Sequence, residues 1–418
     1  MQWAGGQKCF YARGRVQIVK LDNDQMGATE RVWTAVNLEE PDRVPIYLMG
    51  MPAYADFYQE FLRREEDDAL GFSEFTEVPG NLKFTPLGDL TVPYFFGQEV
   101  AHCRVDVEGR FTKPVDEEGR VVEDGKPPAL AGEEGLQVTY YGRLEGVKRL
   151  PNGHLYTWYV DGFLKTKQAV IDWFDRWGWP HEKPVSRLDL KAAAEFRSRF
   201  GDDFALVHSI GGAGLYEKAW FMMGQARFLY YARKDPEFVE RVVDSLKQMQ
   251  LNVVDELKRD EPKIFWCADD MGQKGRSLLS PALYRKFISP ARREVFEAIH
   301  EEAGAKVVMH SCGNVVELLP LLVEDGLDGW QSMEPAAEID HAAVKKKFGD
   351  RLSLWGGIDS SRVMCFGATA DVREHVRRQL GALAPGGGYV AGPAHDYLNV
   401  RVDNALAARD AILEFGRY

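Results

Sequence analysis

The chain has 418 residues, and 52 lysines and arginines against 64 aspartates and glutamates give it a formal net charge of −12. Hydrophobic residues make up 45% and charged residues 28%, a globular composition that excludes a disordered or fibrous protein. The acidic balance argues against a surface for nucleic acids or anionic membranes, because phosphate groups are bound by clustered lysines and arginines. No apolar run reaches the ~18 residues that a membrane span needs.

Five cysteines are scattered along the chain, at Cys9, Cys103, Cys267, Cys312 and Cys365. They are odd in number and sparse for the length, so they do not form a disulfide framework. This usage predicts a reducing compartment, the cytoplasm.

The first 25 residues carry basic side chains but no apolar core of a secretory signal. From Met26 on the pattern changes, because a helix N-cap signature at residues 27–30 precedes periodic apolar residues. We therefore predict a folded domain over residues 26–418, and a tail or non-native extension over residues 1–25.

Short apolar runs that alternate with amphipathic helices dominate the chain from about residue 200. The predicted strands are 44–49, 204–210, 263–268, 305–310, 329–333, 352–356 and 388–392. The predicted helices are 236–259, 280–304, 315–325, 340–348 and 369–384. This alternation predicts an α/β protein with a parallel sheet, most simply a (β/α)8 TIM barrel. A doubly wound sheet competes, but no GxGxxG follows an early strand.

Residues 100–165 interrupt this rhythm. They contain glycine-rich acidic turns and alternating stretches such as residues 155–160 (LYTWYV). The pattern predicts a β-hairpin insertion in the N-terminal half of the barrel.

Reactive side chains follow the predicted strands, where the active sites of barrels lie. They are His208, Asp269, Asp270, His310, Cys312, Glu334, Asp359, His395 and Asp396. Carboxylate, imidazole and thiol without many cations indicate a metal site or acid–base chemistry. His208 is the weaker candidate among them, and the alternative is a histidine of the core or the barrel wall. We expect His341 and His375, on helix patterns, to lie at the surface.

His310 and Cys312 are two residues apart where a strand ends, so both side chains can face one ion. Zinc binds imidazole nitrogen and thiolate sulfur, and a catalytic site needs three protein ligands. His395 is the expected third ligand, and Glu334 competes with it. The alternative is that Cys312 packs as a small apolar residue and His310 hydrogen-bonds a carbonyl.

Asp269 and Asp270 follow a buried strand as adjacent carboxylates. We expect one to face the barrel mouth and the other the wall. The facing carboxylate would hold a ligating histidine or act as a base, whereas the alternative is that it caps the next loop.

The sequence resembles the uroporphyrinogen decarboxylase superfamily from about Thr29 to Glu414. The stretches that carry this resemblance are residues 40–45 (EPDRVP), 269–272 (DDMG), 280–284 (SPALY), 310–314 (HSCGN), 355–359 (WGGID) and 386–395 (GGGYVAGPAH). The resemblance implies a (β/α)8 barrel. It implies two alternative reactions, because the superfamily contains both decarboxylases and methyltransferases.

The decarboxylase branch uses no cofactor and binds substrate carboxylates through an arginine-bearing LMRQAGR segment. The matching stretch here is residues 48–54 (LMGMPAY), with Gly50 and Tyr54 in place of both arginines. A substrate with many carboxylates needs such charge-assisted contacts. The departure argues against a porphyrin substrate.

The other branch contains zinc-dependent methyltransferases of corrinoid systems, including O-demethylase components. Its thiol-activating members bind zinc through an HxCGN-like motif and a later cysteine, and His310 and Cys312 match the first two positions. His395 stands where that branch has the cysteine. The decarboxylases also have a histidine nearby, so this position does not decide between the branches.

The leading hypothesis is a zinc-dependent methyltransferase that acts on a methoxy compound or methylamine with a corrinoid partner protein. Asp269 or Asp270 would orient a ligand or handle a proton, with Glu334 and His395 as further catalytic candidates. Residues expected near the substrate are Tyr54, Tyr94, Tyr216, Trp220 and Asp359. A homodimer is compatible with this reading.

Two other functions stay open. A cofactor-free decarboxylase would use His395 and an aspartate as proton donors and expose cations such as Arg276 and Arg362. A non-catalytic barrel would bind a corrinoid or small ligand for a partner.

Overall fold

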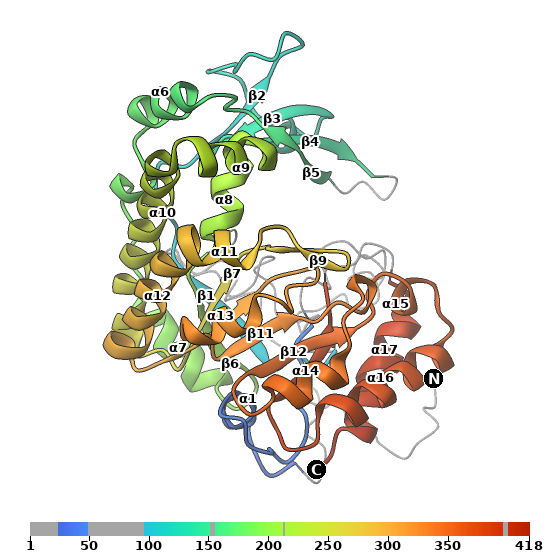
Figure 1. The fold of residues 1–418 in the computed structure, drawn as a ribbon. Helices are drawn as coiled ribbons and strands as arrows, with labels where there is room; N and C mark the ends of the chain where they lie inside the picture. Colours follow the sequence, from blue (N-terminus) through green and yellow to red (C-terminus); the bar gives the residue numbers. More distant parts are fainter. Residues whose placement is uncertain (1–23, 49–95, 151–154, 212–213, 396–399) are drawn as a thin grey trace. The chain divides into compact units, whose positions relative to one another are not determined.

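A computed structural model describes residues 24–48, 96–150, 155–211, 214–395 and 400–418 (Figure 1). Most of the predicted tail lies outside these residues. So do four positions that the sequence analysis singled out: Gly50, Tyr54, Tyr94 and Asp396.

The main sheet has seven strands in the order β1-β6-β7-β10-β11-β12-β13. Their bounds are β1 (Val100–Arg104), β6 (Ala205–Ser209), β7 (Ile264–Ala268), β10 (Lys306–His310), β11 (Gly329–Ser332), β12 (Ser353–Ile358) and β13 (Tyr389–Pro393). Pairing is parallel between β6 and β7, β7 and β10, β11 and β12, and β12 and β13. The predicted α/β architecture with a parallel sheet is confirmed.

In place of the predicted first strand at residues 44–49, the described residues 44–48 form an isolated β-bridge with its hydrogen bonds. Ile46 forms a parallel bridge with Ala391 of β13, and the amide of Tyr47 donates to the Ala391 carbonyl at 2.9 Å. All residues of β12 and β13 are buried, as expected for parallel strands that are covered on both faces.

The chain divides into two compact units. The first comprises residues 1–103, 189–207 and 329–418, and the second comprises residues 104–188 and 208–328. Helices of the first are α1 (Ala28–Val36), α7 (Leu190–Phe200), α14 (His341–Phe348), α15 (Val363–Phe366), α16 (Thr369–Leu383) and α17 (Val402–Phe415). Helix α16 packs against α14, α15, α17 and β12 (Figure 1).

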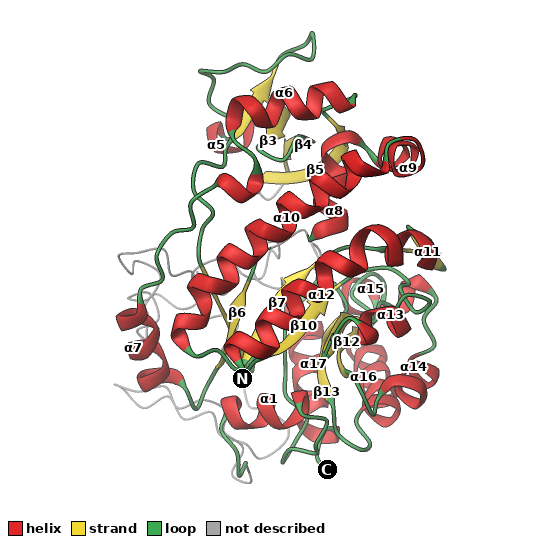
Figure 2. Ribbon diagram, turned by 60° about the vertical axis from the view of Figure 1, so that its left-hand side comes forward, coloured by secondary structure: helices red, strands yellow, loops and turns green. Residues whose placement is uncertain are grey.

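The second unit is built around the 22-residue helix α10 (Pro236–Leu257), which begins where the Asp235 side chain accepts from the Phe238 amide. Its other helices are α6 (Lys167–Trp177), α8 (Leu215–Met223), α9 (Gln225–Lys234), α11 (Pro281–Leu283), α12 (Ser289–Glu297) and α13 (Leu319–Glu324). Helix α10 packs against α8, α9 and α12 (Figure 2). The predicted helix 280–304 contains two π-helical turns, at Tyr284–Ile288 and Ala298–Glu302. None of the described helices is long and apolar enough to span a membrane.

A four-stranded antiparallel sheet also belongs to the second unit. Its strands are β2 (Thr112–Val115), β3 (Gly135–Thr139), β4 (Arg143–Arg149) and β5 (Leu155–Gly162), hydrogen-bonded in chain order. It is larger than the predicted hairpin, and the short helix α5 (Pro128–Ala131) follows β2. The sequence analysis was wrong about residues 100–104, which form β1 of the main sheet.

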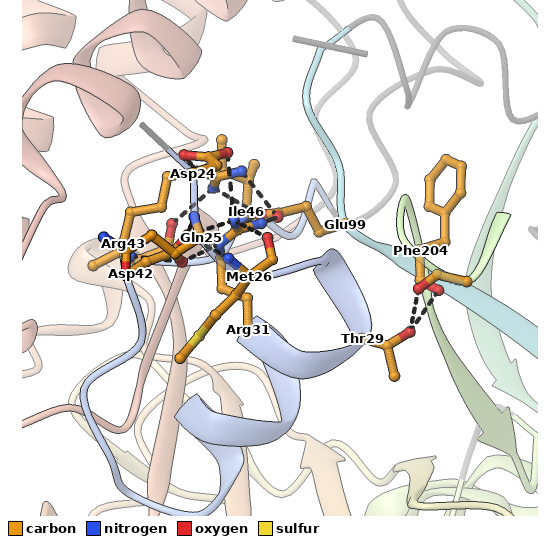
Figure 3. A network of polar contacts seen from close by, with 12 residues as sticks. Asp24, Gln25, Met26, Thr29, Arg31, Asp42, Arg43, Ile46, Glu99 and Phe204 are labelled. Atoms are coloured by element: carbon orange, nitrogen blue, oxygen red, sulfur yellow. Dashed lines mark hydrogen bonds and ion pairs between the residues drawn. The ribbon is translucent and has the colours of Figure 1, made fainter. Parts of the chain in front are cut away.

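A buried ionic network fixes the start of the first unit (Figure 3). Arg31 of α1 binds Asp42 at 2.7 Å, Asp24 at 3.3 Å and also Glu99. Arg43 binds Glu99 at 2.8 Å and Asp24 at 3.1 Å. Burial alone would raise the pKa of Asp42, but the hydrogen bond and charge of Arg31 outweigh it and lower the pKa to about 2.

Glu99 is the shared anion of both arginines, so we expect Glu99→Gln to destabilise the protein by about 3 kcal/mol, because it leaves two buried guanidinium groups short of a counter-charge. The measurement is the urea midpoint of unfolding. The matched control is Glu195→Gln, whose half-exposed side chain lies 3.8 Å from Arg199 and should change stability by less than about 1 kcal/mol. Equal midpoints for both variants would contradict the importance of this network.

Candidate functional site

The ends of β7 and β10 lie side by side in the second unit. Their parallel register pairs Cys267 with Met309 and Ala268 with His310. The residues that follow the two strands therefore leave the sheet as neighbours: Asp269 and Asp270 after β7, and Ser311 and Cys312 after β10.

The two loops after these strands are locked together. The Met271 amide donates to Ser311 Oγ at 3.1 Å, and the Asn314 amide donates to the Gln273 carbonyl at 2.9 Å. Gly313 has a φ of +71°, and a Cβ there would lie 2.3 Å from the carbonyl carbon of Gly272. Glycine at 313 is required both by this conformation and by the close backbone approach.

Asp270 holds the histidine and the cysteine of the HSC motif. Its Oδ1 lies 3.3 Å from His310 Nε2 and accepts the Cys312 amide at 3.0 Å. Burial alone would raise the pKa of Asp270, but the charge and hydrogen bond of His310 and the bonds from Cys312 outweigh it, so the pKa is lowered. Asp270 is therefore ionised and committed to these two residues.

Asp269 has different partners and faces the wall. It is fully buried and accepts the amides of Tyr216 at 3.1 Å and Glu217 at 2.8 Å, which start helix α8. The buried guanidinium of Arg292 on α12 also donates a hydrogen bond to the Asp269 carboxylate. The glycine before α8 makes room for this contact, because a Cβ on Gly214 would lie 2.4 Å from the Asp269 side chain. Among the described residues, the hydrogen bonds of the Asp269 side chain hold helices α8 and α12, and its catalytic role stays a prediction.

His310 and Cys312 are suited to bind a metal ion. Each offers one ligand atom, and these atoms lie within 4.8 Å of each other. His310 is buried and Cys312 half-buried. An imidazole and a thiol, with a carboxylate holding the imidazole, match the donors and the outer partner of zinc sites. The residues present therefore fit zinc.

Glu217 is a site residue that the sequence analysis missed. Burial raises the pKa of its carboxyl, and the negative charges of Asp270 and Asp269 raise it further. The positive charges of Lys218 and Arg143 lower the pKa by less, so the resulting value is about 8. Perturbed carboxyls of this kind gather at functional sites. The signal in the sequence is a lone glutamate in an apolar helix (LYEKAWFMM), which points to no partner by itself.

Lys218 and the aromatic residues Tyr216 and Trp220 share helix α8 with this carboxyl. Lys218 is buried, with its Nζ 5.2 Å from the centre of the Tyr141 ring, and burial lowers its pKa to about 8. Trp220 packs against Tyr159 with ring centres 5.0 Å apart. Tyr216 is fully buried and its hydroxyl lies 3.4 Å from Gln225 Nε2; its role as a substrate contact stays a prediction.

His208 belongs to the wall of the second unit. Its Nε2 lies 2.7 Å from Asp260 Oδ2, and both side chains are buried. Asp260 ends the turn after α10, so the pair joins the sheet to the helix layer.

The first unit carries Glu334 and His395, which stand two residues after the ends of β11 and β13. Ser332 and Met333, which precede Glu334, have φ values of +130° and +47°, sparsely populated for non-glycine residues. The Met333 carbonyl is held by His341 Nε2 at 2.7 Å. The Gln331 amide nitrogen lies 3.4 Å from the carbonyl of Ala394, next to His395.

Asp359 lines a cavity of about 600 Å³ in the first unit, together with Arg362, His341 and His375. Its Oδ1 accepts the amides of Ser361 and Arg362 at 2.9 and 2.8 Å. The prediction that His341 and His375 lie at the surface was wrong, because both are buried. Each ring satisfies a backbone group at a strand end, since His375 Nε2 accepts the Asp359 amide at 3.0 Å.

A family model and one solved structure agree with this architecture. A family model described as uroporphyrinogen decarboxylase (URO-D) matches residues 188–415. The structure resembles a methyltransferase from Methanosarcina mazei with a TM-score of 0.60 and 15% identity, over 94% of this chain and 99% of that chain. A likeness with a TM-score of 0.34 and 11% identity is to a B12-independent methionine synthase from Shewanella sp. W3-18-1, over 55% of this chain and 67% of that chain. No curated protein matches the chain.

Arg292 is the counter-ion of Asp269, so we expect Arg292→Met to destabilise the protein by about 3–5 kcal/mol, because a buried carboxylate loses its partner. The measurement is the free energy of unfolding in urea. Arg285→Met, which removes a largely exposed arginine 3.3 Å from Glu324, should cost less than about 1 kcal/mol. A small effect of Arg292→Met would show that the Asp269 carboxylate does not depend on this cation.

Proposed function

Because the chain belongs to the uroporphyrinogen decarboxylase (URO-D) family, we propose that it is a zinc-dependent methyltransferase of a corrinoid system. The transfer would move a methyl group from a small donor, a methoxy compound or a methylamine, to the corrinoid of a partner protein. The likeness in fold to a methyltransferase from Methanosarcina mazei supports this choice within the family.

The observation that carries the proposal is the pair of donor atoms after β10. The imidazole of His310 and the thiol of Cys312 lie within 4.8 Å of each other, and Asp270 contacts both residues. A cofactor-free decarboxylase has no need of a thiol beside an oriented imidazole, whereas a zinc site requires such donors.

The proposed ligands are His310, Cys312 and His395, the set that the sequence analysis predicts. Glu334 is the alternative third ligand, because it also follows a strand end of the sheet. Three protein ligands leave a coordination position for a substrate, as in catalytic zinc sites.

Each protein group has a distinct task in this proposal. When bound, zinc supplies Lewis-acid activation of the donor heteroatom or stabilises a thiolate. Asp270 fixes the ring plane of His310 and the backbone at Cys312. Asp269 fixes α8 and thereby the position of Glu217. We further propose that the segment around Ile46 closes the sheet as the eighth strand of a (β/α)8 barrel.

The decarboxylase reading is the competing function. It requires cations at the substrate, and the sequence analysis named Arg276 and Arg362 for that role. Both are exposed, and Arg362 lies 3.6 Å from Asp359 in the first unit. A protein that carries no metal and releases carbon dioxide from a carboxylated substrate would favour this function.

The proposal predicts about one zinc ion per chain in the dialysed protein, by mass spectrometry. His310→Ala and Cys312→Ala should lose the metal, because each removes a ligand, and Asp270→Asn should weaken zinc binding roughly 10–100-fold through its partner histidine.

The matched control is Cys365→Ala, which removes a half-buried cysteine whose thiol donates to the Ser360 carbonyl in the first unit. Its zinc content should equal that of the unsubstituted protein. Metal retained in folded Cys312→Ala would contradict the proposed site.

A further inference from the structure

We infer that the cavity beside helix α16 of the first unit, called here the α16 cavity, is a binding site for a small organic anion that carries a phosphate or carboxylate group. The inference goes beyond the proposed function, because neither a proposed zinc ligand nor any residue of the second unit lines the cavity. Asp359, which the sequence analysis expected near the substrate, is one of the lining residues.

The α16 cavity lies at the ends of two neighbouring strands. Its volume is about 600 Å³, within the range of pockets that hold small molecules. Its lining residues come from positions 335–341 after β11, positions 359–363 after β12, and positions 375–382 of α16. Helix α14, which begins at His341, packs against α16 (Figure 1). The cavity therefore opens at the carboxyl ends of parallel strands, the edge at which α/β proteins bind ligands.

Two buried histidines form a fixed wall of this cavity. His341 Nε2 donates to the Met333 carbonyl at 2.7 Å, and its Nδ1 lies 2.6 Å from the side chain of Gln379. His375 Nε2 accepts the Asp359 amide at 3.0 Å. Each ring is held by a backbone group, so this wall does not have to be ordered when a ligand binds.

The two arginines of the cavity are not committed to protein partners. Arg362 Nε lies 3.6 Å from Asp359 Oδ2, and Arg378 Nε lies 4.0 Å from Glu374 Oε1, both longer than a hydrogen bond. Among the described residues, neither guanidinium group donates a hydrogen bond, and both side chains are largely exposed. Both groups are therefore available to an incoming ligand.

The other arginines of α16 are paired. Arg377 makes two hydrogen bonds of 2.8 Å with Glu374, and Arg373 donates to Glu414 at 2.6 Å. Neither of them lines the cavity. Of the arginines on this helix, the one at the cavity is thus the one without a close partner among the described residues, as expected of a ligand contact.

The charge around the cavity is opposite in sign to that of the whole chain. Residues 341–383 contain eight lysines and arginines against four aspartates and glutamates, whereas the chain has a net charge of −12. A local excess of positive charge raises the concentration of anions near that part of the surface. It also argues against a cationic ligand.

These groups define the chemistry of the ligand. A guanidinium group binds the oxygens of phosphate or carboxylate through paired hydrogen bonds, and two such groups favour the doubly charged phosphate. Asp340 and Asp359 also line the cavity, and their carboxylates can accept hydrogen bonds from hydroxyl groups. Ile339 and Val363 supply apolar surface for a short carbon skeleton. We therefore expect a small hydroxylated phosphate ester to bind more tightly than a hydroxylated carboxylic acid.

The test is isothermal titration calorimetry of the unsubstituted full chain with glycerol 3-phosphate, glycerate and glycerol. These probes share a hydroxylated three-carbon skeleton and differ in the anionic group. Glycerol 3-phosphate should bind most tightly, and glycerol should not bind. Tighter binding of glycerate would support the site and identify its anion as a carboxylate. Failure of both anions to bind at millimolar concentration would overturn the inference.

Arg362→Gln and Arg378→Gln should each weaken the binding of glycerol 3-phosphate about 10–100-fold, because each removes a charge-assisted hydrogen bond. The matched control is Arg373→Gln, which removes the same charge from the same helix at a position paired with Glu414. Its affinity should change less than about 3-fold, because an exposed charge away from the ligand is screened.

A second variant tests the cavity without changing any charge. Ala382→Phe places a ring where alanine lines the cavity and should also weaken binding, while the unfolding midpoint and the zinc content stay those of the unsubstituted protein. Equal losses in all three arginine variants would show attraction by surface charge alone and overturn the inference, as would unchanged affinity of Ala382→Phe. Because the probes bind without zinc or a methyl donor, absence of zinc would overturn the proposed function and leave this site standing.

Discussion

The buried pair of Asp269 and Arg292 is the interaction on which the candidate site of the second unit depends. A carboxylate removed from water is stable there because it has a guanidinium and two helix amides as partners. The Asp269 amide also donates to the His310 carbonyl at 2.9 Å. One residue thus connects strand β7, strand β10, helix α8 and helix α12.

This connection separates the tasks of two neighbouring carboxylates. Asp269 binds two amides and a guanidinium of the scaffold, so Asp270 leaves the strand end in a fixed position and reaches the HSC motif. Burial first, and then the charges of Asp270 and Asp269, raise the pKa of Glu217 to about 8.

The sequence predicts the strands well because they are local signals. The predicted runs 263–268 and 305–310 correspond to Ile264–Ala268 and Lys306–His310, since buried parallel strands are continuous apolar segments. Side chains that follow such strands gather at one edge by topology alone. For that reason the sequence predicts that Asp270, His310 and Cys312 lie close together, and the contacts of Asp270 with the other two residues follow from the parallel register.

The remaining features depend on pairing across long stretches of chain. In the sequence, Glu217 is an isolated glutamate on an apolar helix. Its neighbour Asp269 follows β7, more than 50 residues later in the chain, and only folding brings the two together. His341 and His375 have the spacing of surface helix residues, yet they are buried because the Met333 carbonyl and the Asp359 amide need partners.

The strained exit of β11 shows the same dependence. Met333 adopts a φ of +47°, and the His341 ring that holds its carbonyl comes from the following helix. A strained turn of this kind persists only where its surroundings fix it. In both units, therefore, the strand ends supply the reactive side chains and the helices supply the groups that hold and tune them. Substitutions on the helices should change the chemistry while leaving the proposed ligands in place.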